Sequence, residues 1–342
     1  MSENGKGTHH ARKFWVAGAT GFLGSHLVQQ LGARGDEVVA VSKSGGKVGD
    51  VSVTALDVLD ETAVAESARG AEGAFLCTGK VTRDREASEE LYELHVQGTR
   101  AALRGLRAAG VKRVVVASTS GTLAVGRDPH RIADEGCRAP LELIAVWPYY
   151  RTKFYAEREA LEQNQPGEFE VVIANPSLLL GPGDVRESST GDVRRFLEGS
   201  VPAIPAGGIA YVDVRDAAFG LVLCFEKGRA GERYILNGHN ITLAGFFQRL
   251  ERISGVKAPF LKMPSSRPVA IGIGKLFGKA VKAIGGTSPI DEVSLEMAQY
   301  FWYCDSAKAE RELGFRARDP GETLLDTVDD LIARKVVFPK RA

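Results

Sequence analysis

The stretch Gly18-Ala19-Thr20-Gly21-Phe22-Leu23-Gly24 decides the fold of this chain. Its three glycines have G-x-x-G-x-x-G spacing and follow an apolar strand predicted over Phe14–Ala17, and a helix is predicted next over Ser25–Ala33. The first glycine of such a turn allows a sharp bend, the second lets the backbone approach a pyrophosphate, and the third lets the helix pack closely on the strand. The N-terminus of the helix faces the phosphate charge. The stretch therefore predicts a dinucleotide-binding turn, with contacts from Gly18, Thr20, Gly21, Phe22, Leu23 and Gly24. A glycine-rich turn without a ligand is the alternative.

Strands and helices alternate through the first half of the chain. Strands are predicted over Glu37–Ser42, Val51–Leu56, Gly73–Cys77, Arg113–Ser118 and Glu170–Asn175, and helices over Glu61–Arg69, Glu86–Ala109 and Pro148–Asn164. The strands are apolar along their whole length, which is typical of parallel sheets covered on both faces. We therefore predict an α/β fold, a Rossmann doubly wound parallel sheet with a smaller C-terminal substrate-binding region.

The expected domain organisation has three parts. Residues 1–13 are polar and are predicted to form a disordered tail, and residues 14–176 form the dinucleotide-binding Rossmann domain. Residues 177–342 form mainly a substrate-binding region whose elements are partly interleaved with the sheet. The helices of that region are predicted over Val214–Glu226, Leu243–Ser254, Asp291–Tyr300, Ser306–Leu313 and Glu322–Arg334.

The composition argues against several other classes of protein. The 342 residues carry a formal net charge of +1, so no basic field argues for nucleic-acid binding. The four cysteines are scattered and form no C-x-x-C pair, which favours free thiols in a reducing compartment and no metal site. The sequence shows neither a signal-peptide core nor an apolar run of about 20 residues. We therefore expect a cytoplasmic protein.

The residues after the second predicted strand indicate which dinucleotide binds. An NAD site usually has an acidic residue there, about 20 positions after the glycines, to hold the ribose 2′-hydroxyl. This chain has Ser42-Lys43-Ser44 instead, a cation and two hydroxyls that suit a 2′-phosphate. NADPH/NADP+ is therefore preferred over NAD, and a solvated loop position is the alternative for Lys43. The ends of the next two strands add further expected cofactor contacts: Asp57, Val58, Cys77, Thr78 and Gly79. Asp57 is alternatively a helix cap.

Tyr149 and Lys153 are the candidate catalytic pair. They are four residues apart on a predicted helix, so both side chains reach the same space. A neighbouring ammonium group stabilises a phenolate and brings the pKa of a tyrosine down from about 10 toward working pH. Ser118-Thr119-Ser120 ends the fifth strand, at the edge where ligands bind in such sheets, and either Ser120 or Thr119 is expected to hold the substrate oxygen.

Together these motifs resemble the extended short-chain dehydrogenase/reductase family. The matching pieces, in the family's order, are Val16 to Gly24, Ser118-Thr119-Ser120, Tyr149-x-x-x-Lys153, Asn175-Pro176-Ser177, Gly181-Pro182-Gly183-Asp184 and Tyr211-Val212-Asp213-Val214-Arg215-Asp216. Within the family, the chain is similar to the branch that holds dihydroflavonol 4-reductase, cinnamoyl-CoA reductase, 3β-hydroxysteroid dehydrogenase and the hopanoid-associated proteins. One departure is His95 in the long helix, where relatives often have asparagine.

The resemblance implies roles for individual residues and an assembly. Tyr149 is then the general acid/base and Lys153 its tuner and a ribose ligand, while Pro176 and Ser177 lie along the nicotinamide. Relatives dimerise through the two helices predicted here over Glu86–Ala109 and Pro148–Asn164. The expected apolar seam of the homodimer consists of Leu91, Leu94, Ala101, Ala102 and Phe154.

The segment 267–286 bears on the substrate. Its lysines Lys275, Lys279 and Lys282 recur every three to four residues between apolar stretches, which predicts a basic amphipathic helix. The helix is either a lid that also makes weak peripheral contact with an anionic membrane surface, or a core helix with its lysines in water. A lid favours a hydrophobic, sterol- or triterpenoid-like substrate.

Three functions remain open at this point. An NADP(H)-dependent oxidoreductase that interconverts a secondary alcohol and a ketone agrees best with the motifs. A sugar-nucleotide epimerase or dehydratase uses the same tyrosine and lysine, but usually has an acidic residue after the second strand. A non-enzymatic NADP-binding sensor typically lacks the tyrosine or the lysine, and this chain has both.

Overall fold

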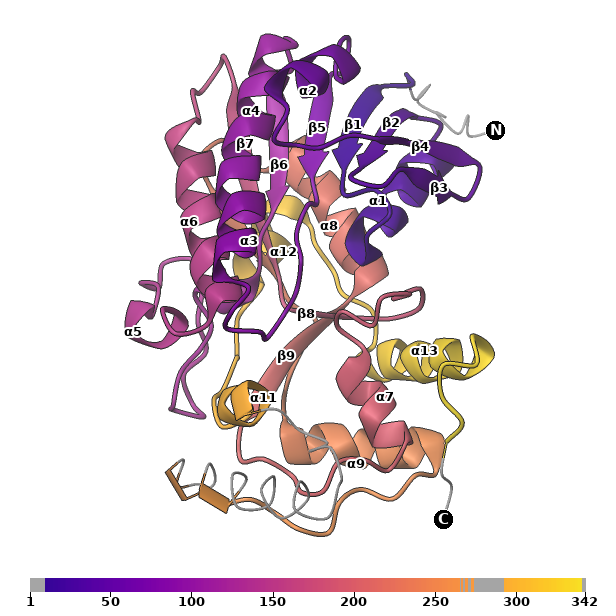
Figure 1. Cartoon of the computed structure of the whole chain (residues 1–342), viewed down its shortest axis with the longest axis vertical. Coiled ribbons are helices and arrows are strands. Elements are labelled where there is room, and N and C mark those ends of the chain that lie inside the picture. The colour runs from indigo at the N-terminus through magenta and orange to yellow at the C-terminus, as the bar shows by residue number, and fades with distance from the viewer. Residues whose placement is uncertain (1–9, 265, 267, 270–271, 274–291, 340–342) are drawn as a thin grey trace, which may run out of the picture.

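The computed structural model describes residues 10–264, 266, 268–269, 272–273 and 292–339. Eight strands form the main sheet in the order β10-β7-β6-β5-β1-β2-β4-β3 (Figure 1). Seven of them run parallel: β1 (Lys13–Ala17), β2 (Glu37–Ser42), β4 (Val51–Ala55), β5 (Gly73–Leu76), β6 (Arg113–Ala117), β7 (Glu170–Pro176) and β10 (Arg233–Leu236). The short edge strand β3 (Gly46–Val48), which was not predicted, is antiparallel to β4. The predicted doubly wound sheet is therefore confirmed. Lys13, predicted as the last residue of the tail, instead begins β1, and residues 1–9 lie outside the described residues.

Helices cover both faces of the main sheet, and the strands show why. Phe14 and Val16 of β1 pack into one buried apolar cluster, whereas Trp15 and Ala17 pack into another. The first cluster is covered by α1 (Phe22–Ala33), α8 (Val214–Lys227) and α12 (Ala307–Leu313). The second is covered by α2 (Glu61–Ser67), α4 (Gly98–Ala108) and α6 (Pro148–Glu162). Because both faces are buried at β1, the successive residues Phe14 to Ala17 are all apolar.

The helix predicted over Glu86–Ala109 is divided into three parts. It consists of α3 (Ser88–Tyr92), the π-helical turn η1 (Glu93–Gln97) and α4. In η1 the N–H of Gly98 donates to the carbonyl of Glu93, five residues back. Such a turn holds one residue more than an α-helical turn, and π-bulges often occur at functional sites. Here the turn carries the buried side chains of His95 and Val96.

The C-terminal half of the chain builds a second lobe and also returns to the first. A three-stranded sheet contains β8 (Leu178–Leu180), β9 (Gly208–Asp213) and β11 (His239–Thr242). The lobe also contains α7 (Gly191–Leu197), α9 (Leu243–Ser254), α11 (Glu292–Met297) and α13 (Pro320–Ala333) (Figure 1). The short helix α5 (Leu141–Ile144) precedes α6. Strand β10 and helices α8 and α12 come from beyond residue 177, yet they belong to the sheet layers of the first lobe.

Two expectations are affected by burial and by the described range. Leu91, Ala101 and Ala102, predicted to face a second subunit, are buried inside the protomer, because α3 and α4 pack on neighbouring elements with these residues. Leu94 and Phe154 are half-buried, and the homodimer remains a prediction. The predicted lid over 267–286 lies outside the described residues apart from 268–269 and 272–273, which are helical.

Within the described ranges, no helix is both long and apolar enough to cross a membrane.

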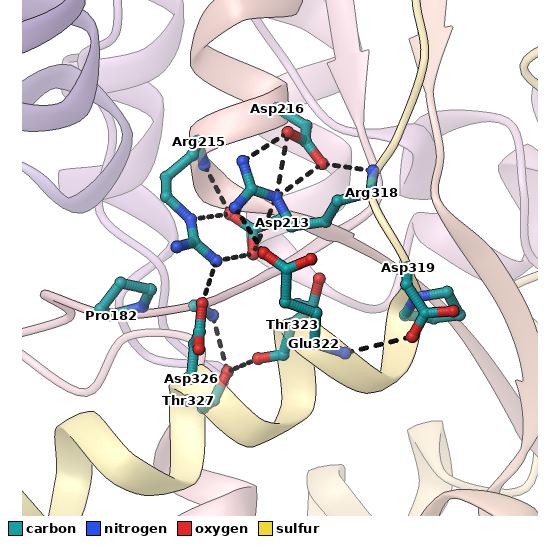
Figure 2. Close-up of polar contacts among 12 residues, drawn as sticks. Pro182, Asp213, Arg215, Asp216, Arg318, Asp319, Glu322, Thr323, Asp326 and Thr327 are labelled. Carbon is teal, nitrogen blue, oxygen red and sulfur yellow. Dashed lines mark hydrogen bonds and ion pairs between the residues drawn. The ribbon is translucent and has the colours of Figure 1, made fainter.

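A cluster of charged residues joins the start of α8 to the C-terminal segment (Figure 2). Asp213, buried at the end of β9, accepts two hydrogen bonds from the Arg215 side chain at 2.8 and 2.7 Å. Arg215 also donates to Asp326 of α13 at 2.6 Å. Arg318 donates to Asp216 through its backbone and its guanidinium, each at 2.8 Å, and lies 3.5 Å from Asp213. The family-like sequence from Tyr211 to Asp216 therefore carries the ionic contact that binds the C-terminal segment to the rest of the fold.

Replacing Arg318 with alanine should destabilise the protein strongly. The change leaves Asp216 and the buried Asp213 with fewer cationic partners, and we expect the free energy of unfolding to fall by about 2–4 kcal/mol. The control is Arg311→Ala, which removes a pair with Glu312 from an exposed position and should cost less than about 0.5 kcal/mol. Urea unfolding followed by circular dichroism measures both. Equal losses in the two variants would show that the cluster is not a major source of stability.

Candidate active site

The glycine-rich turn between β1 and α1 has the close contacts that a phosphate cradle needs. Gly18 has a φ of 73°, and a Cβ atom there would lie 2.5 Å from the carbonyl oxygen of Cys77. A Cβ at Gly24 would lie 2.2 Å from the carbonyl oxygen of Gly18. Gly21 is the N-cap of α1, and Phe22 and Leu23 form its first turn. No side chain fits at Gly18 or Gly24, so the turn packs at backbone distance against the strand end and the helix, as a turn that binds a dinucleotide phosphate requires.

The loop after β2 lies beside this turn. A Cβ at Gly46 would be 3.6 Å from the Thr20 side chain. Lys43 is 85% exposed and its ammonium lies 3.6 Å from the Asp57 carboxylate, which also accepts a hydrogen bond from the Leu59 N–H. The loop thus presents Lys43 and the exposed Ser44, whereas Ser42 is buried and its hydroxyl donates to the Gly45 carbonyl at 3.3 Å. Val58, which was also predicted as a contact, is buried in the second apolar cluster.

Lys153 lies at the centre of the candidate site. Its side chain is buried, and Nζ donates to the carbonyls of Ala117 at 3.0 Å and Thr78 at 3.3 Å. These carbonyls end β6 and follow β5, so the ammonium bridges two neighbouring strand ends. A Cβ at Gly79 would lie 3.3 Å from Nζ, which requires glycine or a shifted lysine at this point. Burial lowers the pKa of Lys153 to about 8, and the Cys77 thiol and the Glu157 carboxylate oppose this shift.

His95 occupies the position where relatives often have asparagine, and it anchors the loop after β5. Its Nδ1 lies 2.8 Å from the Thr152 hydroxyl, which donates to the Pro148 carbonyl at 2.8 Å. Nδ1 therefore carries the proton, and Nε2 accepts from the Lys80 N–H at 3.1 Å. Burial lowers the pKa of His95 to about 2, and the Lys153 ammonium lowers it further. The ring is a neutral link between α6 and the loop that carries Thr78 and Gly79.

Tyr149 is half-buried at the start of α6, on the same helical face as Lys153. Its ring packs edge-on against His95, with the ring centroids 5.7 Å apart, and against Tyr150, at 5.0 Å. Burial raises the pKa of the Tyr149 phenol above its ordinary value, and Tyr150 raises it further. The phenol is therefore protonated at neutral pH. The expected lowering of its pKa by Lys153 does not appear in this structure, where burial is the dominant cause.

The three hydroxyls at the end of β6 have different surroundings. Ser118 is buried and donates to the Glu157 carboxylate at 2.5 Å. Ser120 begins the short 3₁₀ turn η2 (Ser120–Thr122), is buried, and lies beside the Cys304 thiol. Thr119 is half-buried, and its hydroxyl oxygen accepts from the Gly121 N–H at 3.2 Å. Sequence reasoning could not separate these hydroxyls, because Glu157 and Cys304 lie far away in the chain.

Pro176 and Ser177 end β7 on the other side of β6. Ser177 is buried, and its hydroxyl donates to the side-chain oxygen of Asn237 at 2.9 Å. The predicted site residues that follow β5, that follow β6 and that lie on α6 thus meet at one edge of the sheet. Lys153 of α6 joins the other two segments, because it donates to the carbonyls of Thr78 and Ala117. No group of three His, Cys, Asp or Glu side chains suited to a metal ion occurs among the residues that the structure describes.

Aromatic side chains that the sequence analysis did not single out extend from Tyr149. Tyr150 packs on Trp302 with a centroid distance of 4.8 Å, and Trp302 packs on Trp147 at 5.5 Å. Trp302 lies more than 150 residues away in sequence, so no local pattern could place it here. The group supplies an apolar surface next to the candidate acid.

The loop that follows β5 also reaches the second lobe. Arg83 donates to Asp192 of α7 at 2.8 Å and to Ser294 of α11 at 2.6 Å, and Arg85 donates to Glu296 of α11 at 2.6 Å. The same loop begins with Thr78 and Gly79, whose positions depend on Lys153 and His95. The predicted cofactor contacts are therefore tied directly to helices of the second lobe.

Comparison with known proteins places this geometry among nucleotide-dependent enzymes. The model of the NAD dependent epimerase/dehydratase family matches residues 14–237. The chain is 31% identical to a Synechocystis protein named "Putative dihydroflavonol 4-reductase", covering 92% of this chain and 93% of that protein. It is 32% identical to sterol demethylase protein B of Methylococcus capsulatus, covering 73% and 76%.

Two further comparisons extend over almost the whole chain. A 4-hydroxy-2-methyl-3-oxo-4-farnesyl-3,4-dihydroquinoline-1-oxide ketoreductase of Stigmatella aurantiaca is 27% identical, covering 92% of this chain and 95% of that protein. The solved structure of gox2253 has a TM-score of 0.78 with 26% identity, covering 94% and 98%. The structure of MoeE5 with UDP-glucose and NAD has a TM-score of 0.72 with 22% identity, covering 95% and 100%, and shows the shared fold.

The buried ammonium predicts an unusual dependence of stability on pH. Lys153 has a pKa of about 8 in the folded protein, below the ordinary value of 10.5 that it regains on unfolding. Between these values the unfolded chain binds more protons than the folded one, so the free energy of unfolding should rise with pH, by about 1–3 kcal/mol in total. Lys153→Met should lose this rise, and the exposed control Lys112→Met should keep it. Urea titrations between pH 7.5 and 10.5 test this, and parallel curves for parent and Lys153→Met would contradict it.

Proposed function

Because the chain belongs to the NAD-dependent epimerase/dehydratase family, whose extended short-chain dehydrogenase/reductase fold it shares, we propose that it is an NADP(H)-dependent oxidoreductase acting on a hydrophobic small molecule. It interconverts a secondary alcohol and a ketone, with Tyr149 as the general acid/base. The observation that carries the proposal is the buried Lys153 ammonium, which lies between the ends of β5 and β6 on the same helical face as Tyr149. Two relatives that each match 92% of this chain are named as reductases, which supports an oxidoreductase.

The residues of the site fit the cofactor, and each has its own part in the reaction. Gly18, Gly21 and Gly24 form a cradle for the pyrophosphate, and Lys153 keeps a third N–H beyond the two that it donates to carbonyls. A bound nicotinamide supplies or accepts the hydride. In ketone reduction, the protonated Tyr149 phenol donates its proton to the oxygen that becomes the alcohol. In the reverse direction a Tyr149 phenolate must take this proton. Burial dominates the pKa of Tyr149 in this structure, so that phenolate would need the positive nicotinamide ring beside it in addition to the Lys153 charge.

The substrate is proposed to be a hydrophobic ketone or alcohol, of sterol or triterpenoid type. The half-buried rings of Tyr150 and Trp302, backed by the buried Trp147, lie beside Tyr149 and suit an apolar ring system. The names of two relatives refer to a sterol and to a farnesyl-bearing ring ketone. These aromatic rings offer few hydrogen-bond partners for the sugar and phosphate groups of a sugar nucleotide.

The cofactor is proposed to be NADPH/NADP+. Lys43 and Ser44 are exposed beside Thr20 and the glycine turn, where a 2′-phosphate of the adenosine would lie. Neither position carries the acidic side chain that holds a free ribose 2′-hydroxyl. Asp57 lies close to Lys43, but both are exposed, so their attraction is weak and does not prevent Lys43 from meeting a phosphate.

The preference for NADPH should depend on Lys43. In the parent protein NADPH should bind more tightly than NADH, and Lys43→Ala should reduce that preference by about 1–2 kcal/mol, the worth of one charge-assisted contact. Lys47→Ala, an exposed lysine of β3, is the matched control and should leave the preference unchanged. Isothermal titration calorimetry measures both affinities. Equal or tighter NADH binding to the parent would reject the assignment.

Turnover should depend on the Tyr149 hydroxyl. Tyr149→Phe should lower kcat by about 10²–10⁴ while leaving NADPH affinity nearly intact, because only the proton donor is lost. Tyr155→Phe, at an exposed position of the same helix, is the control. NADPH oxidation is followed with cholestanone, a dihydroflavonol, a farnesyl quinoline oxide and UDP-glucose as the panel. Undiminished turnover in Tyr149→Phe, or turnover of UDP-glucose alone, would overturn the proposed function.

A further inference from the structure

Glu157 is a buried carboxylate that the proposed reaction does not use. It lies one helical turn beyond Lys153 on α6 and is 1% exposed. Its Oε1 atom accepts from the hydroxyl of Ser118 at 2.5 Å, the hydroxyl of Thr122 at 2.8 Å and the side-chain amide of Asn175 at 2.7 Å. These three donors come from β6, η2 and β7. One carboxylate therefore organises the strand ends directly beneath the candidate active site.

The contacts around Glu157 come from groups that suit a carboxylate. Three donors point at Oε1, and Oε2 accepts no hydrogen bond but lies 3.5 Å from the guanidinium of Arg233 on β10. A glutamine at this position keeps an oxygen for the three donors, but it loses the attraction to Arg233 and turns an amide donor toward that guanidinium. The three hydrogen bonds should therefore be weaker around a glutamine than around the carboxylate.

Asn175 transmits the position of Glu157 to Thr119. Its amide nitrogen donates one hydrogen to Glu157 and the other to the backbone carbonyl of Thr119 at 2.9 Å. Glu157 thus orients the Asn175 amide, and the amide holds the Thr119 backbone in place. Weakening the contact with Glu157 removes one of the two bonds that orient the Asn175 amide toward Thr119, whose carbonyl then keeps the nearby Thr122 hydroxyl, at 3.0 Å, as its other donor.

The same contacts distinguish the three hydroxyls at the end of β6. Ser118 is committed to Glu157, and Ser120 is buried against the Cys304 thiol. Thr119 is half-buried, and its oxygen accepts from the Gly121 N–H. Among the described residues, neither the Thr119 nor the Ser120 hydroxyl donates a hydrogen bond to a neighbour. Ser120 is only 5% exposed, whereas Thr119 is partly exposed, so the Thr119 hydroxyl is the one accessible to a substrate oxygen.

We propose that Glu157 is a positioning residue that makes Thr119, and neither Ser118 nor Ser120, the hydroxyl that holds the substrate carbonyl beside Tyr149. This inference rests on the proposed function, because it assigns a partner to the acid of that reaction. Glu157 acts through Asn175 and the Thr119 backbone and does not itself contact the substrate.

Coupling between substitutions at Glu157 and at Thr119 tests the proposal. With the ketone of the panel that the parent turns over fastest, Glu157→Gln should lower kcat at least about tenfold, the rate equivalent of one charge-assisted hydrogen bond. NADPH affinity should stay within about twofold of the parent. Glu159→Gln is the matched control, since Glu159 lies on the same helix and pairs with Arg100 on its outer side. In a Thr119→Ala background, Glu157→Gln should change kcat by less than about twofold, because its effect passes through Thr119.

A second readout does not depend on a substrate. Hydrogen exchange in peptides covering 118–122 should be faster in Glu157→Gln than in the parent and unchanged in Glu159→Gln. If Glu157→Gln fails to fold, Asn175→Ala removes the same link from its other end and should show the same exchange and the same coupling to Thr119.

The outcomes separate this proposal from the proposed function. Three results would each overturn the role of Glu157. The losses in kcat could multiply in the Glu157→Gln/Thr119→Ala double variant, or hydrogen exchange over 118–122 could be unchanged in Glu157→Gln. Turnover could also be lost in Ser120→Ala and kept in full in Thr119→Ala. Full activity of Tyr149→Phe would instead overturn the reaction itself. Loss of turnover in Tyr149→Phe with full turnover in Glu157→Gln would leave the function standing and reject the inference.

Discussion

A buried ammonium group holds the candidate site together. Parallel strands leave backbone carbonyls unpaired where they end, and buried carbonyls need donors. Lys153 supplies them to Ala117 and Thr78, so one side chain joins the ends of β6 and β5. Other residues of the site are arranged around this bridge: Tyr149 one turn earlier on α6, Glu157 one turn later, and His95 on η1, which holds the neighbouring loop at Lys80. The burial that makes the bridge rigid also lowers the pKa of its lysine, so the same contacts decide the charge and the shape of the site.

The sequence predicted what local geometry controls. Gly18 and Gly24 could be assigned because a side chain at either position collides with a backbone atom of a neighbouring segment, and the spacing of such glycines is visible in the sequence. The apolar strands were equally visible, since both faces of the sheet are covered. The π-helical turn, the second sheet and the burial of Leu91 depend on contacts that no short pattern encodes. Glu157 stands four positions after Lys153, so its place on α6 could be predicted, but its three donors on β6, η2 and β7 could not.

The loop after β5 gives the two lobes a common boundary. Its first residues contact Lys153 and His95, and its later residues Arg83 and Arg85 bind α7 and α11. In the proposed function, a cofactor at Thr78 and Gly79 and a substrate at the second lobe would rest on the same short segment.

The ionic cluster of Figure 2 also orders events during synthesis. Arg318 reaches Asp216 across 102 positions, and Arg215 reaches Asp326 across 111. A ribosome that adds about 5–20 residues per second needs about 5–20 s to cover such a distance. The contacts of Asp216 with Arg318, and of Arg215 with Asp326, can therefore form only after almost the whole chain has been synthesised. Closing loops of this length costs entropy before any contact is gained.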